Sequence, residues 1–469
     1  MSRTETLIER IGDIPVLTQE KLVQAKSRDF YWYSPVLKRK LDRVCADVVV
    51  SPRSEDEVRE VLAHCWALDL PVTPRGGGTG NYGQAMPLAG GVVLDMTRMK
   101  ALKGINDGVA RVEPGALMGE LQQQTRNEAG LELRMHPSTL ETATIGGFLA
   151  GGSGGVGSIN WGMLRETGNI LSLRVATAEQ EPRLLQIEGD AIQTVLHAYG
   201  TNGIITEIEM PLSPAQDWIE VIASFDDWMA AVRTGWSLAH QEGLWFKQLA
   251  AIQAPAPFDY FARHRKFLEE GDNLLCILAA PSAIRPLIQA LDQAGGRLAY
   301  RSDTAAAEEK KGLPHLHHLT WNHTTFRALK TDPEMTYLQV GLPASDPIGM
   351  VERLASEYPG EIIGHVEITR SSGRVSASFL PIYRFSSEAR LIQVAHELEA
   401  AGCACYNPHA YTYEEGNHSG PDEMRLAMKR RTDPKGLLNP GKMIGWDDPD
   451  YVYDTAGGYD YPGLKERAA

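Results

Sequence analysis

The sequence has 469 residues, more than one hydrophobic core usually covers, so two or three domains are expected. Hydrophobic residues make up 43% and charged residues 23%, which excludes a disordered chain, a coiled coil or a fibre. The net charge of −14 repels a polyanion and no Lys/Arg-rich run offsets it, so nucleic-acid binding is not expected.

The N-terminus lacks an apolar signal region, and no stretch approaches the ~20 apolar residues of a membrane span. We therefore expect neither a secretion signal nor a transmembrane segment. The cysteines are few, odd in number and scattered, which indicates a reducing, cytoplasmic location rather than a disulfide framework. They are Cys45, Cys65, Cys276, Cys403 and Cys405.

Short strands and helices are expected to alternate from about residue 41 to 213. Ser54 and Glu57 fit a capping box, and apolar residues then recur at helical spacing, which predicts an amphipathic helix over 55–69. That helix leads into a strand-like segment at 70–75. Further strands are predicted at 92–96, 109–113, 171–177 and 203–212, and a helix over 116–129.

The character of the sequence changes at residues 213–218, where glycines become fewer and aromatic residues more frequent, so a domain boundary is placed there. A helix over 226–241, a strand over 274–280 and a helix over 282–294 predict a second α+β domain. The expected division is an N-terminal segment 1–40, domains 41–213 and 214–405, and a C-terminal segment 406–469. Its acidic, Tyr-rich tail, 447–469, is expected to be either a surface arm or disordered.

A glycine-rich loop at 76–83 follows the strand-like segment. Residues 78–83 match the dinucleotide pattern G-x-G-x-x-G, but a Rossmann loop opens into a helix, whereas Pro87 and a predicted strand at 92–96 follow here. A glycine-rich loop between strands still binds phosphate, because its backbone N–H groups form a nest for anions. We expect a phosphate-binding loop without a Rossmann fold.

A second glycine-rich run at 144–157 contains G-x-S-x-G, which would make Ser153 the nucleophile of a serine hydrolase. That motif needs a strand before the serine and a helix after it, and residues 154–162 are not expected to sustain a helix. The hydrolase is kept only as an alternative. Gly441-Lys442 is not a P-loop, because Met443 stands where a magnesium-binding hydroxyl is needed.

Together these motifs resemble the FAD-binding oxidoreductase family of vanillyl-alcohol oxidase and p-cresol methylhydroxylase, nearest its D-lactate and glycolate dehydrogenase branch. The resemblance covers 74–88, 91–99, 110–116, 136–158, 199–208 and 433–443. It implies an α+β fold, with a PCMH-type FAD-binding domain of two α+β subdomains and an α+β substrate domain whose antiparallel sheet caps the flavin. The C-terminal segment returns to the flavin.

The resemblance also implies which residues bind FAD. The pyrophosphate would be bound by Arg75, Gly76, Gly77, Gly78, Thr79, Gly80, Asn81 and Tyr82. The flavin and ribityl chain would contact Pro137, Ser138, Thr139, Thr142, Thr144, Gly146, Gly147, Gly152 and Ser153. The adenine side would contact Gly203, Ile204, Ile205 and Thr206, while Asn439 and Lys442 would lie near the flavin, where a cation stabilises the charge of the reduced ring.

Two departures from the family pattern bear on the chemistry. Thr79 stands where some relatives carry a histidine linked to FAD, and 139–141 contains no cysteine for the other linkage, so FAD is expected to be non-covalent. The branch's GHxGDGNxH metal motif is reduced to Gly364-His365, and one histidine binds a divalent ion poorly. No metal is predicted. An accessory subunit of a multi-subunit dehydrogenase is the alternative this leaves open.

The expected reaction transfers a hydride from a small alcohol, hydroxy acid or phenol-type substrate to FAD. His409 falls near a histidine of the branch and is the candidate base, although a structural histidine is as good an interpretation. Gly152 falls where a small residue admits oxygen to the flavin, but oxygen, a quinone, a cytochrome and a flavoprotein all remain possible acceptors. The tract His315, His317, His318 and His323 is expected to line a pocket or the surface rather than to bind metal.

Overall fold

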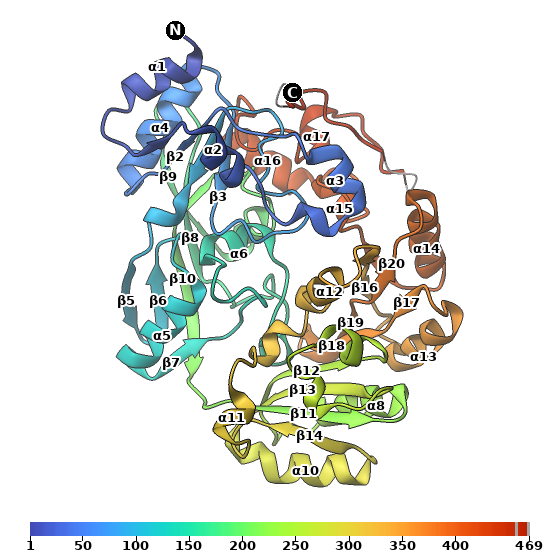
Figure 1. Cartoon of the computed structure of the whole chain (residues 1–469). Coiled ribbons are helices and arrows are strands. Elements are labelled where there is room, and N and C mark those ends of the chain that lie inside the picture. Colours follow the sequence, from blue (N-terminus) through green and yellow to red (C-terminus); the bar gives the residue numbers. More distant parts are fainter. Residues whose placement is uncertain (455–457, 467–469) are drawn as a thin grey trace.

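The computed structural model describes residues 1–454 and 458–466. Figure 1 shows two sheets in an N-terminal part, two further sheets in a cap part, and a C-terminal segment that returns to the N-terminal part. Every strand pairing in the two cap sheets is antiparallel. The expected α+β class with an antiparallel sheet in the second part is confirmed.

The first sheet of the N-terminal part has the order β1-β2-β4-β3, with β2, β4 and β3 parallel. Its strands are β1 (Val16–Leu17), β2 (Val48–Val50), β4 (Val92–Asp95) and β3 (Val72–Arg75). Its helices are α1 (Arg3–Arg10), α2 (Glu20–Lys26), α3 (Pro35–Leu41) and α4 (Glu55–Ala67). Since β1 pairs with β2, residues before the expected boundary at 40/41 belong to this sheet.

The second sheet has the order β5-β6-β10-β8-β9, and β7 pairs with the end of β10. Its strands are β5 (Leu102–Asn106), β6 (Val109–Val112), β7 (Leu131–Leu133), β8 (Ser172–Ala176), β9 (Leu184–Glu188) and β10 (Ile204–Pro214). The helices of this region are α5 (Met118–Ala129), α6 (Ile145–Gly151) and α7 (Ser158–Trp161). The expected boundary at 213/214 lies at the end of β10.

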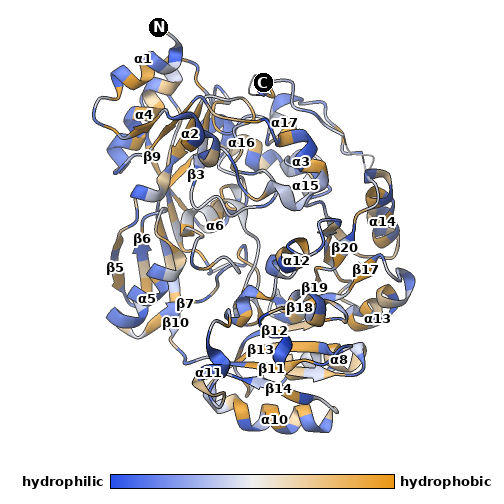
Figure 2. Cartoon of the chain, viewed as in Figure 1, coloured by the Kyte–Doolittle hydropathy of each residue, from blue (hydrophilic) through white to orange (hydrophobic). Residues whose placement is uncertain are grey.

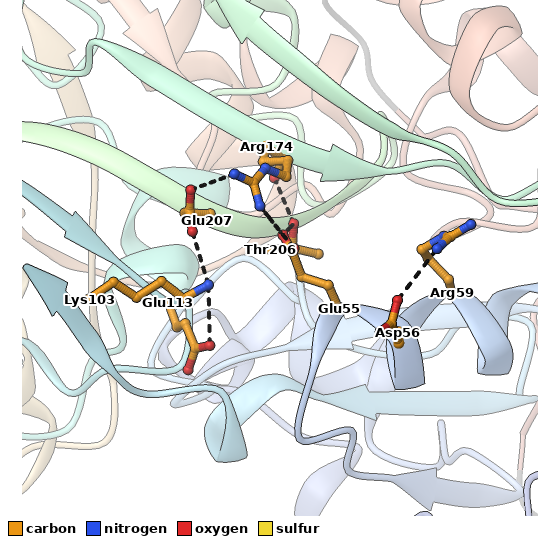
Figure 3. Close-up of polar contacts among 8 residues, drawn as sticks. All are labelled: Glu55, Asp56, Arg59, Lys103, Glu113, Arg174, Thr206 and Glu207. Carbon is orange, nitrogen blue, oxygen red and sulfur yellow. Dashed lines mark hydrogen bonds and ion pairs between the residues drawn. The ribbon is translucent and has the colours of Figure 1, made fainter.

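An ion-pair network joins these two layers (Figure 3). Arg174 on β8 contacts Glu55, at the start of α4, at 2.9 Å and Glu207 on β10 at 2.8 Å. Lys103 on β5 reaches the other oxygen of Glu207 at 2.9 Å, and Thr206 donates to Glu55 at 2.7 Å. Helix α4 of the first layer is therefore fixed to β8 and β10 of the second, and Lys103 joins β5 to the same network.

The main sheet of the cap has the order β14-β11-β13-β12-β18-β19-β16-β21. These strands are β14 (Arg297–Arg301), β11 (Ile219–Phe225), β13 (Asn273–Ala279), β12 (Phe246–Ile252), β18 (His365–Ser371), β19 (Arg374–Phe379), β16 (Gln339–Gly341) and β21 (Ala404–Tyr406). A small sheet contains β15 (Met335–Tyr337), β20 (Ile382–Arg384) and β17 (Ile362–Ile363).

Helices cover both faces of the main cap sheet. A core shared with α8 (Trp228–Ala239), α10 (Ile284–Gln293), α13 (Pro347–Glu357) and α14 (Glu388–Ala400) lies on one face. A separate core, which includes residues of α9 (Ala256–Tyr260) and α12 (Asn322–Leu329), lies on the other, and α11 (Ala307–Lys310) is a short turn nearby. Figure 2 shows apolar residues along the strands and alternating apolar and polar residues on α10 and α13, as expected for helices that cover a sheet.

The C-terminal segment extends the N-terminal part. It contains α15 (Tyr413–Gly416), α16 (Glu423–Thr432) and α17 (Ile444–Asp447). Val72 at the start of β3 donates to the carbonyl of Leu437 and accepts from the N–H of Asn439, both at 2.8 Å. The described tail also packs there, since Tyr461 N–H donates to the Tyr411 hydroxyl at 2.9 Å. Residues 455–457 and 467–469 of the predicted arm lie outside the described residues.

Two sequence expectations need correction. Residues 158–161 do form a helix, α7, but it is a single turn enclosed by Gly157 and Gly162, which both have positive φ. The capping box at α4 is only half formed. The Ser54 hydroxyl accepts from Glu57 N–H, while the Glu57 carboxylate accepts from Arg53 N–H, one residue before the N-cap.

Among the described residues, no helix combines the length and apolarity that crossing a membrane requires.

Candidate functional site

A cavity of about 720 Å³ lies where the N-terminal part meets the cap. On the N-terminal side it is lined by the loop after β3, the segment leading into and following α6, and the turn before β10. On the cap side it is lined by the start of α12 and by β16, β18 and β19. Both glycine-rich runs of the sequence therefore face one cavity, together with a wall from the cap.

The loop after β3 is packed so closely that it requires glycine. A Cβ on Gly76 would lie 2.0 Å from Thr144 Oγ1, and one on Gly77 would lie 2.1 Å from the carbonyl oxygen of Thr142. Gly78 has a positive φ of 66°. In the described structure, the N–H groups of residues 76–81 donate no hydrogen bond to a protein atom. They are free donors beside the cavity, which fits a bound pyrophosphate.

Arg75 adds a buried cation to this loop. Its Nη1 donates to the carbonyl of Arg28 at 2.6 Å, while its buried Nε has no hydrogen-bond partner among the described residues. Burial lowers the pKa of Arg75, and the nearby Asp29 and Asp95 carboxylates oppose that shift. An anionic group in the cavity would be attracted by this cation.

The loop packs against the segment leading into α6. Thr144 is the N-cap of α6, and its Oγ1 accepts from Gly147 N–H at 3.3 Å. Thr139 Oγ1 donates to Thr79 Oγ1 at 3.4 Å, which joins this segment to the loop across the cavity wall. Thr142 turns away, since its Oγ1 donates to the carbonyl of Thr139.

The structure places most of the predicted cofactor residues on this one cavity. Those that line it are Arg75, Gly76, Gly77, Gly78, Thr79, Gly80, Asn81, Tyr82, Pro137, Ser138, Thr139, Thr144, Gly146, Gly147, Gly152, Ser153, Gly203, Ile204 and Ile205. Those outside its lining are Thr142, Thr206, Asn439 and Lys442.

Asn439 and Lys442 hold the glycine-rich loop from behind. Asn439 Nδ2 donates to the carbonyls of Gln84 at 2.7 Å and Tyr199 at 2.6 Å. Lys442 Nζ donates to the carbonyl of Gly83 at 2.6 Å. Burial lowers the pKa of Lys442 to about 7, and the nearby Asp29 carboxylate opposes this shift. Both residues thus fix the end of the loop without facing the cavity.

His409 lies away from the cavity. Its Nε2–H donates to the carbonyl of Tyr337 at 3.0 Å, and Nδ1 accepts from Ser34 Oγ at 2.8 Å. Burial lowers the pKa of this imidazole to about 4. Both ring nitrogens are occupied by the protein, so the position of His409 suits a structural histidine and gives no support to its predicted role as base.

His365, the remaining histidine of the metal motif, is also absent from the cavity lining. It is fully buried, with Nδ1–H donating to Leu380 and Nε2 lying 2.9 Å from Glu367 Oε1. Burial raises the pKa of Glu367, and its hydrogen bond with the His365 ring opposes that shift. This pair has its own partners and does not reach a ligand in the cavity.

Ser153 lines the cavity in a setting unlike that of a hydrolase nucleophile. It follows helix α6 rather than a strand, and no described histidine contacts its hydroxyl. At the neighbouring Gly152, a Cβ would lie 2.6 Å from the Phe148 ring, so this position has no room for a side chain. The geometry offers no support for the hydrolase alternative.

The cap wall was not predicted from the sequence. Thr369 and Ser371 on β18, with Ser376 and Ser378 on β19, place hydroxyl side chains along it. Their spacing of two residues puts each pair on one face of its strand, and this spacing is the only signal for them in the sequence.

The histidine tract is divided, because His323 lines the cavity while His315 is mostly exposed and pairs with Glu220.

Three arginines line the cavity, and no aspartate or glutamate does among its described lining residues. Arg75 lies on the N-terminal side, and Arg165 and Arg370 lie on the remaining walls. Arg370 donates from Nε to Ile159 and from Nη1 to Gly373, which leaves its Nη2 without an acceptor in the described structure. In a chain with a net charge of −14, the lining of this cavity is locally cationic, which favours an anionic ligand.

Comparison with known proteins points to FAD-binding enzymes. The FAD binding domain family matches residues 46–182. D-lactate dehydrogenase of Archaeoglobus fulgidus is 33% identical over 425 residues, which cover 85% of this chain and 91% of that enzyme.

Other relatives match over shorter stretches. The mitochondrial D-lactate dehydrogenase [cytochrome] of Arabidopsis thaliana is 34% identical over 35% of this chain and 30% of that protein. Glycolate oxidase subunit GlcD of Escherichia coli is 33% identical over 38% of this chain and 37% of its own length. This chain thus spans about a third of these two relatives.

A solved structure of alkyldihydroxyacetonephosphate synthase shares the fold. Its TM-score is 0.68 at 16% identity, over 93% of this chain and 85% of that one.

Proposed function

This chain belongs to the vanillyl-alcohol oxidase and p-cresol methylhydroxylase family of FAD-binding oxidoreductases, and on that premise we propose that it oxidises a small 2-hydroxy acid in the cavity between its two parts. The observation that carries this choice is the charge of the cavity. Besides Arg75, which belongs to the predicted pyrophosphate loop, Arg165 and Arg370 line it and no carboxylate does among the described residues. This favours a substrate that carries its own carboxylate over a neutral alcohol or a phenol.

FAD is the cofactor of this family, and the residues present fit it. The free N–H groups of residues 76–81 would hold the pyrophosphate beside the Arg75 cation. When bound, FAD supplies the acceptor for the hydride that leaves the substrate carbon. Thr79 offers a hydroxyl rather than an imidazole at the expected attachment position, which supports non-covalent binding. A colourless pellet after acid precipitation of yellow protein is the expected result, and a yellow pellet would contradict it.

The cap wall would bind and orient the substrate. The free Nη2 of Arg370 is a donor for a substrate carboxylate. His323 lines the same cavity, and its imidazole makes no hydrogen bond to another described residue, so it can accept a hydrogen bond from the substrate hydroxyl. The hydroxyl-rich strands β18 and β19 already line this side of the site, and they would exclude bulk water from the reacting atoms.

The test compares two substrates that differ only in the carboxylate. Anaerobic D-lactate is expected to bleach the flavin absorbance near ~450 nm, and propane-1,2-diol is not. Arg370→Gln should lower kcat/KM for the acid about 10–100-fold, the range for a hydrogen bond to a charged group. The exposed Arg374→Gln on β19 is the matched control. Equal bleaching by the diol would overturn the proposal.

The five buried, unpaired cysteines support a cytoplasmic location, because an oxidising compartment would favour disulfides. Flavin that binds but is bleached by no substrate in a hydroxy-acid panel would instead favour the accessory-subunit alternative. Following the return of the bleached flavin to its oxidised state with oxygen, a quinone, a cytochrome or a flavoprotein identifies the electron acceptor.

A further inference from the structure

Three metal-binding side chains converge at the junction of the two parts. Glu141 lies in the N-terminal part, between Thr139 on the cavity wall and α6, while His317 and His318 lie in a short turn of the cap before α12. Glu141 Oε1 is 3.1 Å from His317 Nε2, and Glu141 Oε2 is 3.4 Å from His318 Nε2. The ligand atoms of all three residues lie within 4.8 Å of one another.

These separations suit a bound ion. Zinc bonds of 2.0–2.1 Å place two tetrahedral ligands ~3.3 Å apart. The distances from Glu141 to His317 and to His318, each measured to a different carboxylate oxygen, are close to this value. Two imidazoles and a carboxylate also form a ligand set found in zinc sites that keep a fourth position open. Imidazole favours zinc and related transition metals, whereas calcium and magnesium prefer oxygen ligands. The residue types and their spacing therefore agree on one class of ion.

The surroundings favour a cation held by these ligands. Among the described residues, Glu141 forms ion pairs with His317 and His318 only, so no lysine or arginine competes for its carboxylate. The His317 ring contacts His136 edge-on at 5.5 Å, and the His318 ring stacks on His323 at 5.4 Å. Several imidazoles thus surround a single carboxylate, an arrangement that supplies neutral nitrogen ligands without a competing fixed charge.

We propose that Glu141, His317 and His318 bind one Zn²⁺-class ion that links the cap to the N-terminal part at the edge of the cavity. His318 stacks on His323, which lines the cavity, and Thr139 lies two residues before Glu141 on the same wall. The ion would therefore fix the cap beside the substrate space. This site uses none of the residues around His365, and it does not depend on the identity of the substrate.

The experiment measures metal binding directly. Flavin-loaded protein is dialysed against EDTA, then into chelator-free buffer, and titrated with Zn²⁺ or Mg²⁺ by calorimetry, with metal content checked by mass spectrometry. We expect one equivalent of Zn²⁺, no comparable binding of Mg²⁺, and a rise in Tm on adding Zn²⁺. Loss of outer contacts alone weakens metal sites 10–100-fold, so Glu141→Gln and His318→Asn should each weaken Zn²⁺ binding by at least ~100-fold.

His315→Asn is the matched control, because the His315 ring stacks on that of His317 but its Nδ1 pairs with Glu220 rather than with Glu141. It should bind Zn²⁺ as the unmodified protein does. Two outcomes overturn the proposal: no zinc equivalent in the unmodified protein, or equal zinc affinity in Glu141→Gln and His318→Asn. The flavin absorbance and the melting temperature of each metal-free variant separate loss of the metal ligand from loss of FAD or of the fold.

Discussion

The Nζ atom of Lys247 lies 2.6 Å from Oε1 of Glu132, and both side chains are almost fully buried. Lys247 belongs to β12 of the cap, and Glu132 belongs to β7 of the N-terminal part. The Glu132 carboxylate also accepts from Arg126 and from the Trp218 indole. A buried charge pair therefore joins the two parts close to the point where the chain passes from one to the other.

Replacing Lys247 with methionine should destabilise the protein. The change leaves Glu132 buried with its remaining partners only, and breaking a buried pair typically costs about 3–5 kcal/mol. The free energy of unfolding in urea is expected to fall by about 3 kcal/mol, because Arg126 and Trp218 retain part of the compensation. The control is Arg233→Ala, which removes the exposed pair with Glu352 and should cost under ~1 kcal/mol. Equal losses in both variants would contradict this account.

Adding one methyl group at Gly77 should impair FAD binding. Its Cβ would lie 2.1 Å from the carbonyl oxygen of Thr142, and a backbone atom cannot move away cheaply. Overpacking of this kind costs about 1–3 kcal/mol, so FAD affinity of Gly77→Ala should fall about 10–100-fold. Gly243→Ala is the control, because no atom lies within 4 Å of its added Cβ. Fluorescence titration of apoprotein with FAD measures both, and unchanged affinity in Gly77→Ala would rule out this packing.

Lys442 and Asp29 should behave as a coupled pair. Asp29 accepts from Tyr31 N–H at 2.9 Å and Ala85 N–H at 3.3 Å, and burial raises its pKa to about 6, with Lys442 opposing that shift. Lys442→Met removes the bond to Gly83 and leaves Asp29 without this cation, so FAD occupancy and stability should both fall. Adding Asp29→Asn should recover part of the stability, which a double-mutant cycle measures. Additive losses would show that the two residues act independently.

The His409 environment predicts a loss of stability in acid. Burial lowers the folded pKa from 6.5 to about 4, so between these values the unfolded chain takes up a proton that the folded chain does not. Stability from this group is present above pH 6.5 and is lost as pH falls toward 4, by about 3 kcal/mol in all. Urea unfolding of His409→Gln from pH 7 to 4 should therefore show a shallower decline.

The variant will keep the acid sensitivity that comes from His197, whose pKa burial also lowers to about 4. Its free energy of unfolding should nevertheless fall less between pH 7 and pH 4 than that of the unmodified protein. If the free energy of unfolding fell by the same amount in both proteins, His409 would not contribute to the pH dependence.

Local patterns predicted many of the elements. The expected helix at 55–69 is α4, Glu55–Ala67, and the strand at 203–212 is part of β10, Ile204–Pro214. These segments follow from apolar spacing and from turn residues that lie close together in the chain. The single-turn helix α7 was missed, because four residues between two glycines with positive φ leave no periodicity to detect.

The cavity could be predicted on one side only. The glycine-rich loops carry their own signal, since close packing and free N–H groups require glycine at fixed places. The cap wall does not, because Arg370 and His323 become neighbours of the cavity only through the long-range pairing of the cap strands. The meeting of Glu141 with His317 likewise joins residues from the two parts, which no local pattern links.

The return of the C-terminal segment sets an order of events during synthesis. Strand β3, which carries the glycine-rich loop, is completed only by hydrogen bonds with residues 437 and 439, and Lys442 closes the loop from behind. A ribosome that has translated the first 214 residues has made both N-terminal sheets but not the residues that brace the cofactor loop. FAD can therefore be held in its final setting only after the whole cap has been translated, and a nascent chain stalled inside the cap should remain colourless.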